Sequence, residues 1–96
     1  MNLPSLRQQI DAIDRRLLRL LNARATLAIR VGRLKRACGA PVLDRQREAA
    51  ILRQVALDNP GPLSRAAIQD IYRAILRQSR RLEAAATAKK SIVHSR

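Results

Sequence analysis

The sequence has few aromatic residues, one cysteine and few acidic residues. It contains one Tyr and no Phe or Trp, so a core must be built from Leu, Ile, Val and Ala. The single cysteine, Cys38, excludes an intramolecular disulfide framework. No Cys or His residues have the spacing of a zinc site, so no metal is expected. Arginine interrupts every apolar run, so no membrane-spanning segment is expected either.

Apolar and basic residues are abundant. Hydrophobic residues make up 47% of the 96-residue chain, which is too many for a disordered basic tail. Lys and Arg number 20 against 7 Asp and Glu, giving a formal net charge of +13. Such a charge calls for an anionic partner. The first residues, 1–4, lack the pattern of a signal peptide, so a cytoplasmic location is expected.

Glycine and proline divide the chain into three segments. Gly39–Pro41 and Asn59–Pro62 are strong helix breakers, and the segments between them are rich in good helix formers. Ser5 opens a sequence with the form of a capping box. We therefore predict an all-α domain over 1–86, with helices at about 5–37, 44–58 and 64–86, and a flexible basic tail over 87–96.

The first predicted helix is longer than the other two can cover. It would be a rod of about 48 Å with an apolar stripe along it, formed by Leu6, Ile10, Ile13, Leu17, Leu20, Leu27, Val31 and Leu34. Left bare, this stripe would be a large hydrophobic patch. A second copy of the chain is the simplest cover, so the pattern predicts a homodimer.

Charged and hydroxyl residues interrupt the apolar stripes of all three helices. They are Arg24 and Lys35 on the first, Asp44, Arg47 and Glu48 on the second, and Ser79 and Glu83 on the third. Asp44 could simply cap its helix. Arg24 lies in the middle of its predicted helix, with apolar stripe residues on both sides, so it cannot be a cap. Because burying an unpaired guanidinium is costly, it must meet a carboxylate from the protein or a ligand. Together these residues predict a polar pocket within the bundle, whose cations suit a multiply anionic small molecule.

The same residues resemble the all-α chorismate mutases. The run from Leu6 to Lys35 is similar to that family's first helix, Asp44-x-x-Arg47-Glu48 to its second, and the segment 71–79 to its third. The resemblance covers about residues 5–86. It implies an intertwined homodimer with two shared active sites, which convert chorismate to prephenate on the route to Phe and Tyr. It implies no cofactor, because the rearrangement is pericyclic and needs positioning and charge stabilisation only.

The resemblance also implies how the substrate is bound. Arg24 and Arg47 would bind its carboxylates, together with Arg7 from the partner chain. Arg7 lies 17 residues before Arg24, about 25 Å along one helix, which is too far to share a site within one chain. Glu48 would hold the ring hydroxyl.

The remaining implied roles concern the reacting atoms. Asp44 and Ser79 would line the pocket, and Lys35 would donate to the ether oxygen as its bond breaks. Glu83 stands where many bacterial members have Gln, and it would also donate there. A carboxylate cannot donate, so Glu83 would have to be protonated, and turnover should fall as pH rises. The expected catalytic residues are therefore Arg24, Lys35 and Glu83.

Three alternatives remain open at this point. An isochorismate-pyruvate lyase shares this fold and pocket, although Glu48 favours the mutase because it suits the chorismate hydroxyl. A nucleic-acid-binding helical dimer would explain the net charge, but stacking aromatics and a recognition motif are lacking. The chain could also act as a regulatory module with another shikimate-pathway enzyme. The expected ligand remains chorismate, with no nucleic acid and no membrane as partner.

Overall fold

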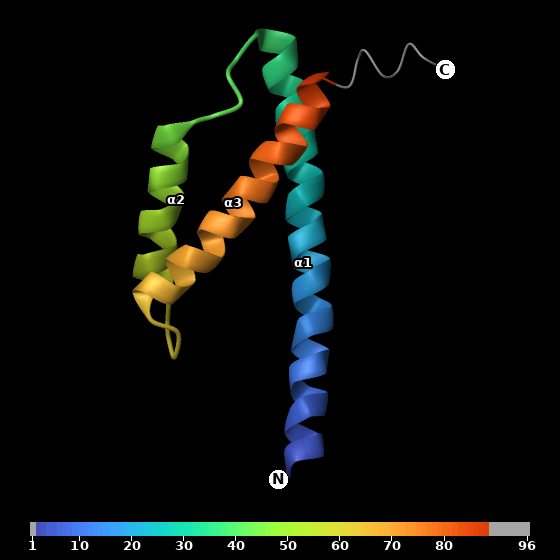
Figure 1. The fold of residues 1–96 in the computed structure, drawn as a ribbon, viewed down its shortest axis with the longest axis vertical. Helices are drawn as coiled ribbons and strands as arrows, with labels where there is room; N and C mark the ends of the chain where they lie inside the picture. Colours follow the sequence, from blue (N-terminus) through green and yellow to red (C-terminus); the bar gives the residue numbers. More distant parts are fainter. Residues whose placement is uncertain (1, 89–96) are drawn as a thin grey trace, which may run out of the picture.

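The computed structural model describes residues 2–88 as three α-helices joined by two loops (Figure 1). These are α1 (Leu3–Cys38), α2 (Arg45–Asp58) and α3 (Arg65–Ala88). No strand occurs in this part of the chain, which confirms the predicted all-α class. No helix in it is long and apolar enough to cross a membrane.

The ends of α1 follow from its capping residues. Asn2 is the N-cap, and its side chain accepts a hydrogen bond of 2.9 Å from the Ser5 backbone N–H. The helix therefore starts two residues before Ser5, and the capping-box prediction was wrong. Pro4 fits the first turn, where its missing N–H costs nothing. At the other end Gly39 adopts a left-handed conformation with φ of 72°, and its N–H bonds to the Lys35 carbonyl.

The other two helices also begin at polar caps. Asp44 caps α2 by accepting a bond of 2.9 Å from the Arg47 N–H, and Ser64 precedes α3 and accepts one of 3.0 Å from the Ala67 N–H. Helix α3 runs on to Ala88. Residues 87 and 88, which were predicted as tail, are therefore helical, and the rest of the predicted tail lies outside the described residues.

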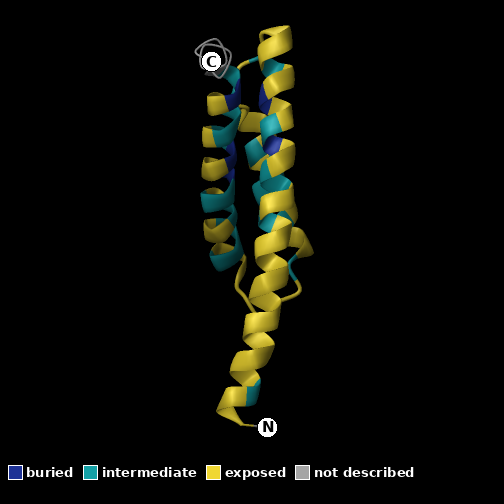
Figure 2. Ribbon diagram, turned by 90° about the vertical axis from the view of Figure 1, so that its right-hand side faces the viewer, coloured by how far each residue is buried: buried dark blue, intermediate teal, exposed yellow. Residues whose placement is uncertain are grey.

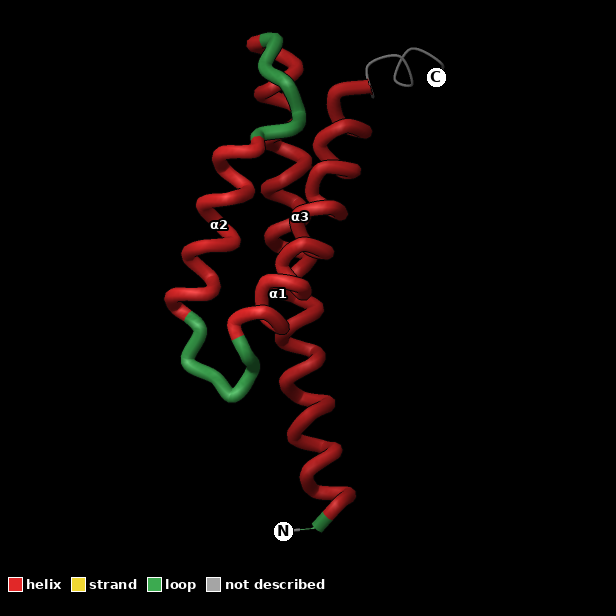
Figure 3. The backbone as a smooth tube through the Cα atoms, turned by 60° about the vertical axis from the view of Figure 1, so that its left-hand side comes forward, coloured by secondary structure: helices red, strands yellow, loops and turns green. Residues whose placement is uncertain are grey.

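Helix α3 packs against both other helices and crosses α1 at an angle (Figures 1 and 3), while no Cα atom of α1 comes within 8 Å of one in α2. Helices α1 and α3 approach each other closely at Gly32. A Cβ added there would lie 2.7 Å from both the Cα and the carbonyl oxygen of Glu83. A glycine inside a helix costs about 1 kcal/mol relative to Ala, and here it allows the helices to cross next to Lys35 and Glu83.

The single chain buries little apolar surface. Only Ala28, Leu76 and Ala86 are buried among the apolar side chains of the described residues. The radius of gyration is 17.1 Å, against about 12 Å for a compact chain of this length. The N-terminal half of α1 projects beyond the other helices and is exposed almost throughout (Figure 2). The large side chains exposed on α1 include all of the predicted stripe: Leu6, Ile10, Ile13, Leu17, Leu20, Leu27, Val31 and Leu34.

Candidate active site

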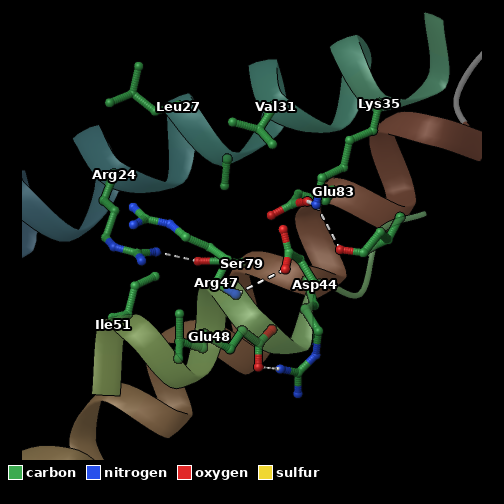
Figure 4. Close-up of a pocket in the computed structure, with 14 residues that line it drawn as sticks. Arg24, Leu27, Val31, Lys35, Asp44, Arg47, Glu48, Ile51, Ser79 and Glu83 are labelled. Atoms are coloured by element: carbon green, nitrogen blue, oxygen red, sulfur yellow. Dashed lines mark hydrogen bonds and ion pairs between the residues drawn. The ribbon is translucent and has the colours of Figure 1, made fainter. Parts of the chain in front are cut away.

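A pocket of about 350 Å³ lies where the three helices meet (Figure 4). This volume falls in the range of small-molecule sites. All seven inward-facing residues singled out from the sequence line it, namely Arg24, Lys35, Asp44, Arg47, Glu48, Ser79 and Glu83. The sequence stripes therefore converge on one cavity, although they come from three separate helices.

Arg24 reaches from α1 to α3. Its Nη1 donates a hydrogen bond of 2.6 Å to Ser79 Oγ, and this hydroxyl donates to the carbonyl of Ile75 at 3.0 Å. Ser79 is buried, so its side chain is fixed by these two contacts. No carboxylate in the described chain pairs with Arg24. Its guanidinium therefore keeps N–H donors for an anion that enters the pocket.

Lys35 is held by two acceptors at the other end of the pocket. Its Nζ lies 2.7 Å from Oε1 of Glu83 and donates to the carbonyl of Val42 at 2.8 Å. The side chains of Lys35 and Glu83 are only 19% and 14% exposed. An ammonium group has three donors, so one remains for a ligand. Gly32 places the two residues opposite each other, because it allows α1 to approach the backbone of Glu83.

Helix α2 brings Asp44, Arg47 and Glu48 to the pocket through its first turn. Asp44 is both the N-cap predicted as its structural role and a pocket-lining residue. Arg47 has no carboxylate partner among residues 2–88. Arg24 and Arg47, neither of which forms an ion pair within residues 2–88, thus face one cavity from α1 and α2 (Figure 4).

Sequence reasoning missed Arg80, which lines the same pocket. Arg80 forms an ion pair with Glu48 on α2. It was overlooked because only the face of α3 that carries Ser79 and Glu83 was followed. Arg80 lies on a second face of α3, which contacts α2. Gln69 lies on the same face, eleven residues or about three helical turns earlier, and its Nε2 donates to the Leu52 carbonyl of α2 at 3.1 Å.

The pocket also has an apolar wall that was not predicted as such. It is formed by Leu27, Ala28, Val31, Val42, Ile51 and Leu76. Ala28 and Leu76 of this wall are buried, whereas Leu27 and Val31 are exposed in the single chain. The cavity is therefore built to hold a small molecule that has both charged groups and an apolar frame.

Arg7 is not among the residues that line this pocket. It is exposed on the projecting half of α1, as its distance along the helix from Arg24 predicts. Its action in the site of a partner chain remains a prediction. Within the described residues, no group of three or more His, Cys, Asp or Glu side chains is arranged to hold a metal ion.

The pocket can bind an anion and stabilise negative charge that develops on it. Four cations and three carboxylates line it, which leaves one net positive charge. Arg24 and Arg47 present forked donors that match carboxylates, and Lys35 is a compact cation with a free donor. This arrangement suits a rearrangement within one bound molecule, which requires orientation and electrostatic stabilisation and no nucleophile from the protein.

Comparisons with known proteins agree with this geometry. Residues 6–84 match the family model described as "Chorismate mutase type II". The chain is 38% identical over 78 residues to the bifunctional chorismate mutase/prephenate dehydratase of Aquifex aeolicus, covering 77% of this chain and 22% of that protein. It is 35% identical over 79 residues to the T-protein of Haemophilus influenzae, covering 80% and 21%. The chain thus spans about a fifth of the length of these curated relatives.

A solved structure of similar size also matches. Form II of chorismate mutase from Thermus thermophilus superposes with a TM-score of 0.83 at 34% identity. The match covers 84% of this chain and 92% of that one. The family model spans nearly the whole helical domain, and the seven pocket residues lie within the matched range. The chain therefore belongs to the type II chorismate mutase family.

Proposed function

We propose that this protein is a chorismate mutase, which rearranges chorismate to prephenate in the biosynthesis of Phe and Tyr. The observation that carries the proposal is the convergence of Arg24, Lys35, Arg47, Ser79 and Glu83 on one pocket. Family membership supports the reaction. A cytoplasmic location remains part of the proposal.

In the proposed mechanism the protein selects a compact conformer of the substrate and stabilises the charge that develops. Arg24 and Arg47 bind the two carboxylates and thereby hold the reacting ends together. The free donor of Lys35 points to the ether oxygen, where negative charge grows as the bond breaks. Glu48 accepts a hydrogen bond from the ring hydroxyl, and the apolar wall packs against the carbon frame.

We further propose that the active form is a homodimer with shared sites. The exposed stripe on α1 supports this, because a single chain leaves these leucine and isoleucine side chains in water. Arg7 lies on the projecting part of α1. A partner's α1 that crosses this chain's bundle would carry its own Arg7 to the pocket and add a third arginine for the carboxylates.

The direct test is the loss of chorismate absorbance in the presence of the purified protein, with prephenate identified as the product. Isochorismate should be assayed in parallel. Turnover of chorismate to prephenate supports the proposal. Formation of salicylate and pyruvate from isochorismate, without prephenate from chorismate, would overturn it in favour of the lyase.

Replacing Glu83 by Gln should flatten the pH profile of turnover. A carboxyl can donate to the ether oxygen only when it carries a proton, so this role predicts that wild-type turnover falls as pH rises, whereas a Glu83 that stays the ionised partner of Lys35 predicts no such fall. An amide donates at every pH, and the variant should keep its activity at the alkaline end. The measurement is kcat for chorismate across pH for both proteins. Two profiles of the same shape would show that Glu83 does not act as a proton-bearing donor.

A further inference from the structure

The ion pair between Arg80 and Glu48 joins α3 to α2 at the edge of the pocket. Nη1 of Arg80 contacts Oε1 of Glu48, and Figure 4 shows this contact as a dashed line at Glu48. The side chains are 35% and 23% exposed, and both residues line the cavity. The pair is therefore partly buried and belongs to the lining of the site.

Arg80 controls which part of the Glu48 carboxylate is free. A carboxylate only accepts hydrogen bonds, and here one of its oxygens, Oε1, is occupied by Arg80. The second oxygen, Oε2, has no partner in the described chain. Fixing one oxygen restricts the rotation of the side chain and leaves the other available for a hydroxyl group of a ligand.

Arg80 also changes the charge that a bound anion meets. The pocket has one net positive charge with Arg80 and none without it. In the proposed function, Glu48 accepts a hydrogen bond from the ring hydroxyl of the substrate, but its negative charge also repels the two carboxylates of that substrate. A cation paired with it on the side of α3 removes this conflict, because the carboxylate keeps its free lone pairs while its charge is compensated.

We propose that Arg80 is a positioning residue for substrate binding, which orients Glu48 towards the ring hydroxyl and compensates its charge. The inference rests on the proposed function, and it adds a residue that acts through another. Because Glu48 holds the hydroxyl before and during the reaction, losing Arg80 weakens binding in the ground state and the transition state alike. Such a loss raises KM and leaves kcat nearly unchanged.

The test compares Arg80→Met with Arg81→Met. Arg81 is the next residue on α3, is exposed and does not line the pocket, so its replacement removes the same charge from the same helix. Arg80→Met should raise the KM for chorismate about tenfold with kcat changed less than about threefold. Arg81→Met should leave both constants near wild type. Arg80→Lys keeps the charge and should restore part of the lost affinity.

A double-mutant cycle with Glu48→Gln distinguishes positioning from a structural role. If Arg80 acts through the Glu48 carboxylate, Arg80→Met should change KM much less in the Glu48→Gln background than in the wild type. An effect of equal size in both backgrounds would overturn the proposal, as would equal constants for Arg80→Met and Arg81→Met. Circular dichroism at the helical bands checks that each variant folds. If Arg80→Met does not fold, Arg80→Lys takes its place: a KM above that of Arg81→Met supports the proposal, and an equal KM overturns it.

The failure of this inference is distinguishable from failure of the proposed function. A wild-type protein that does not turn over chorismate overturns the function and the inference together. A wild-type protein that does, with Arg80 and Arg81 variants indistinguishable, overturns the inference alone.

Discussion

Replacing Arg24 by Ala should lower kcat/KM for chorismate by about 100- to 1,000-fold. Removing one member of a buried, hydrogen-bonded charge pair costs about 2–5 kcal/mol, and each 1.4 kcal/mol is a factor of ten. Arg24 has no carboxylate partner within the described chain, and in the proposed mechanism a substrate carboxylate is its partner. The fold should survive, because Ser79 still donates to the Ile75 carbonyl.

Arg33→Ala is the matched control for Arg24→Ala. Arg33 lies nine residues later on α1, two and a half turns, and therefore on the opposite face. It is exposed and does not line the pocket. Steady-state kinetics should give near wild-type constants for Arg33→Ala. Equal losses in the two variants would mean that the positive charge of α1 acts only at long range and that Arg24 does not hold the substrate.

Replacing Lys35 by Met should lower kcat by about 100- to 1,000-fold, which is the typical cost of losing one donor to a developing negative charge. Methionine keeps most of the stem and loses the ammonium group. In the proposed mechanism the free donor of Lys35 interacts with the ether oxygen most strongly while the bond is breaking, so the loss should fall on the transition state. KM should change by much less than kcat.

The exposed neighbour Arg36 provides the control for Lys35, because it lies on the same turn of α1 and does not line the pocket. Arg36→Ala should keep both constants near wild type. If Lys35→Met raised KM strongly and left kcat unchanged, Lys35 would be a binding residue for the ground state, and its role at the ether oxygen would be wrong.

Polar residues that interrupt the apolar stripes predicted the pocket where the faces of two helices meet directly. Arg24, Lys35, Ser79 and Glu83 stand where apolar residues are due, and the structure joins them in pairs, Arg24 with Ser79 and Lys35 with Glu83. A charge in an apolar stripe is costly unless a partner lies opposite. The sequence position of such a charge therefore predicts a pocket even without knowledge of the helix arrangement.

Other features depend on how the helices are placed relative to one another. Arg80 was missed because α3 packs against two helices and uses two faces, and a single stripe cannot reveal the second. The loss of helix stability at Gly32 is explained by the crossing of α3, whose backbone at Glu83 leaves no room for a Cβ. The start of α1 was ambiguous because Asn2 and Ser5 are both good caps, and Asn2 is the one that caps the helix.

The most direct measurement mixes two inactive variants, Arg7→Ala and Arg24→Ala. The central claim is that each chorismate mutase site takes Arg24 from one chain and Arg7 from the other. After unfolding and refolding together in equal amounts, half of the dimers should be mixed, each with one intact site and one doubly defective site. The mixture should then regain about a quarter of the wild-type activity. A mixture no more active than the average of the two separate variants, alongside an active wild type, would contradict the shared site.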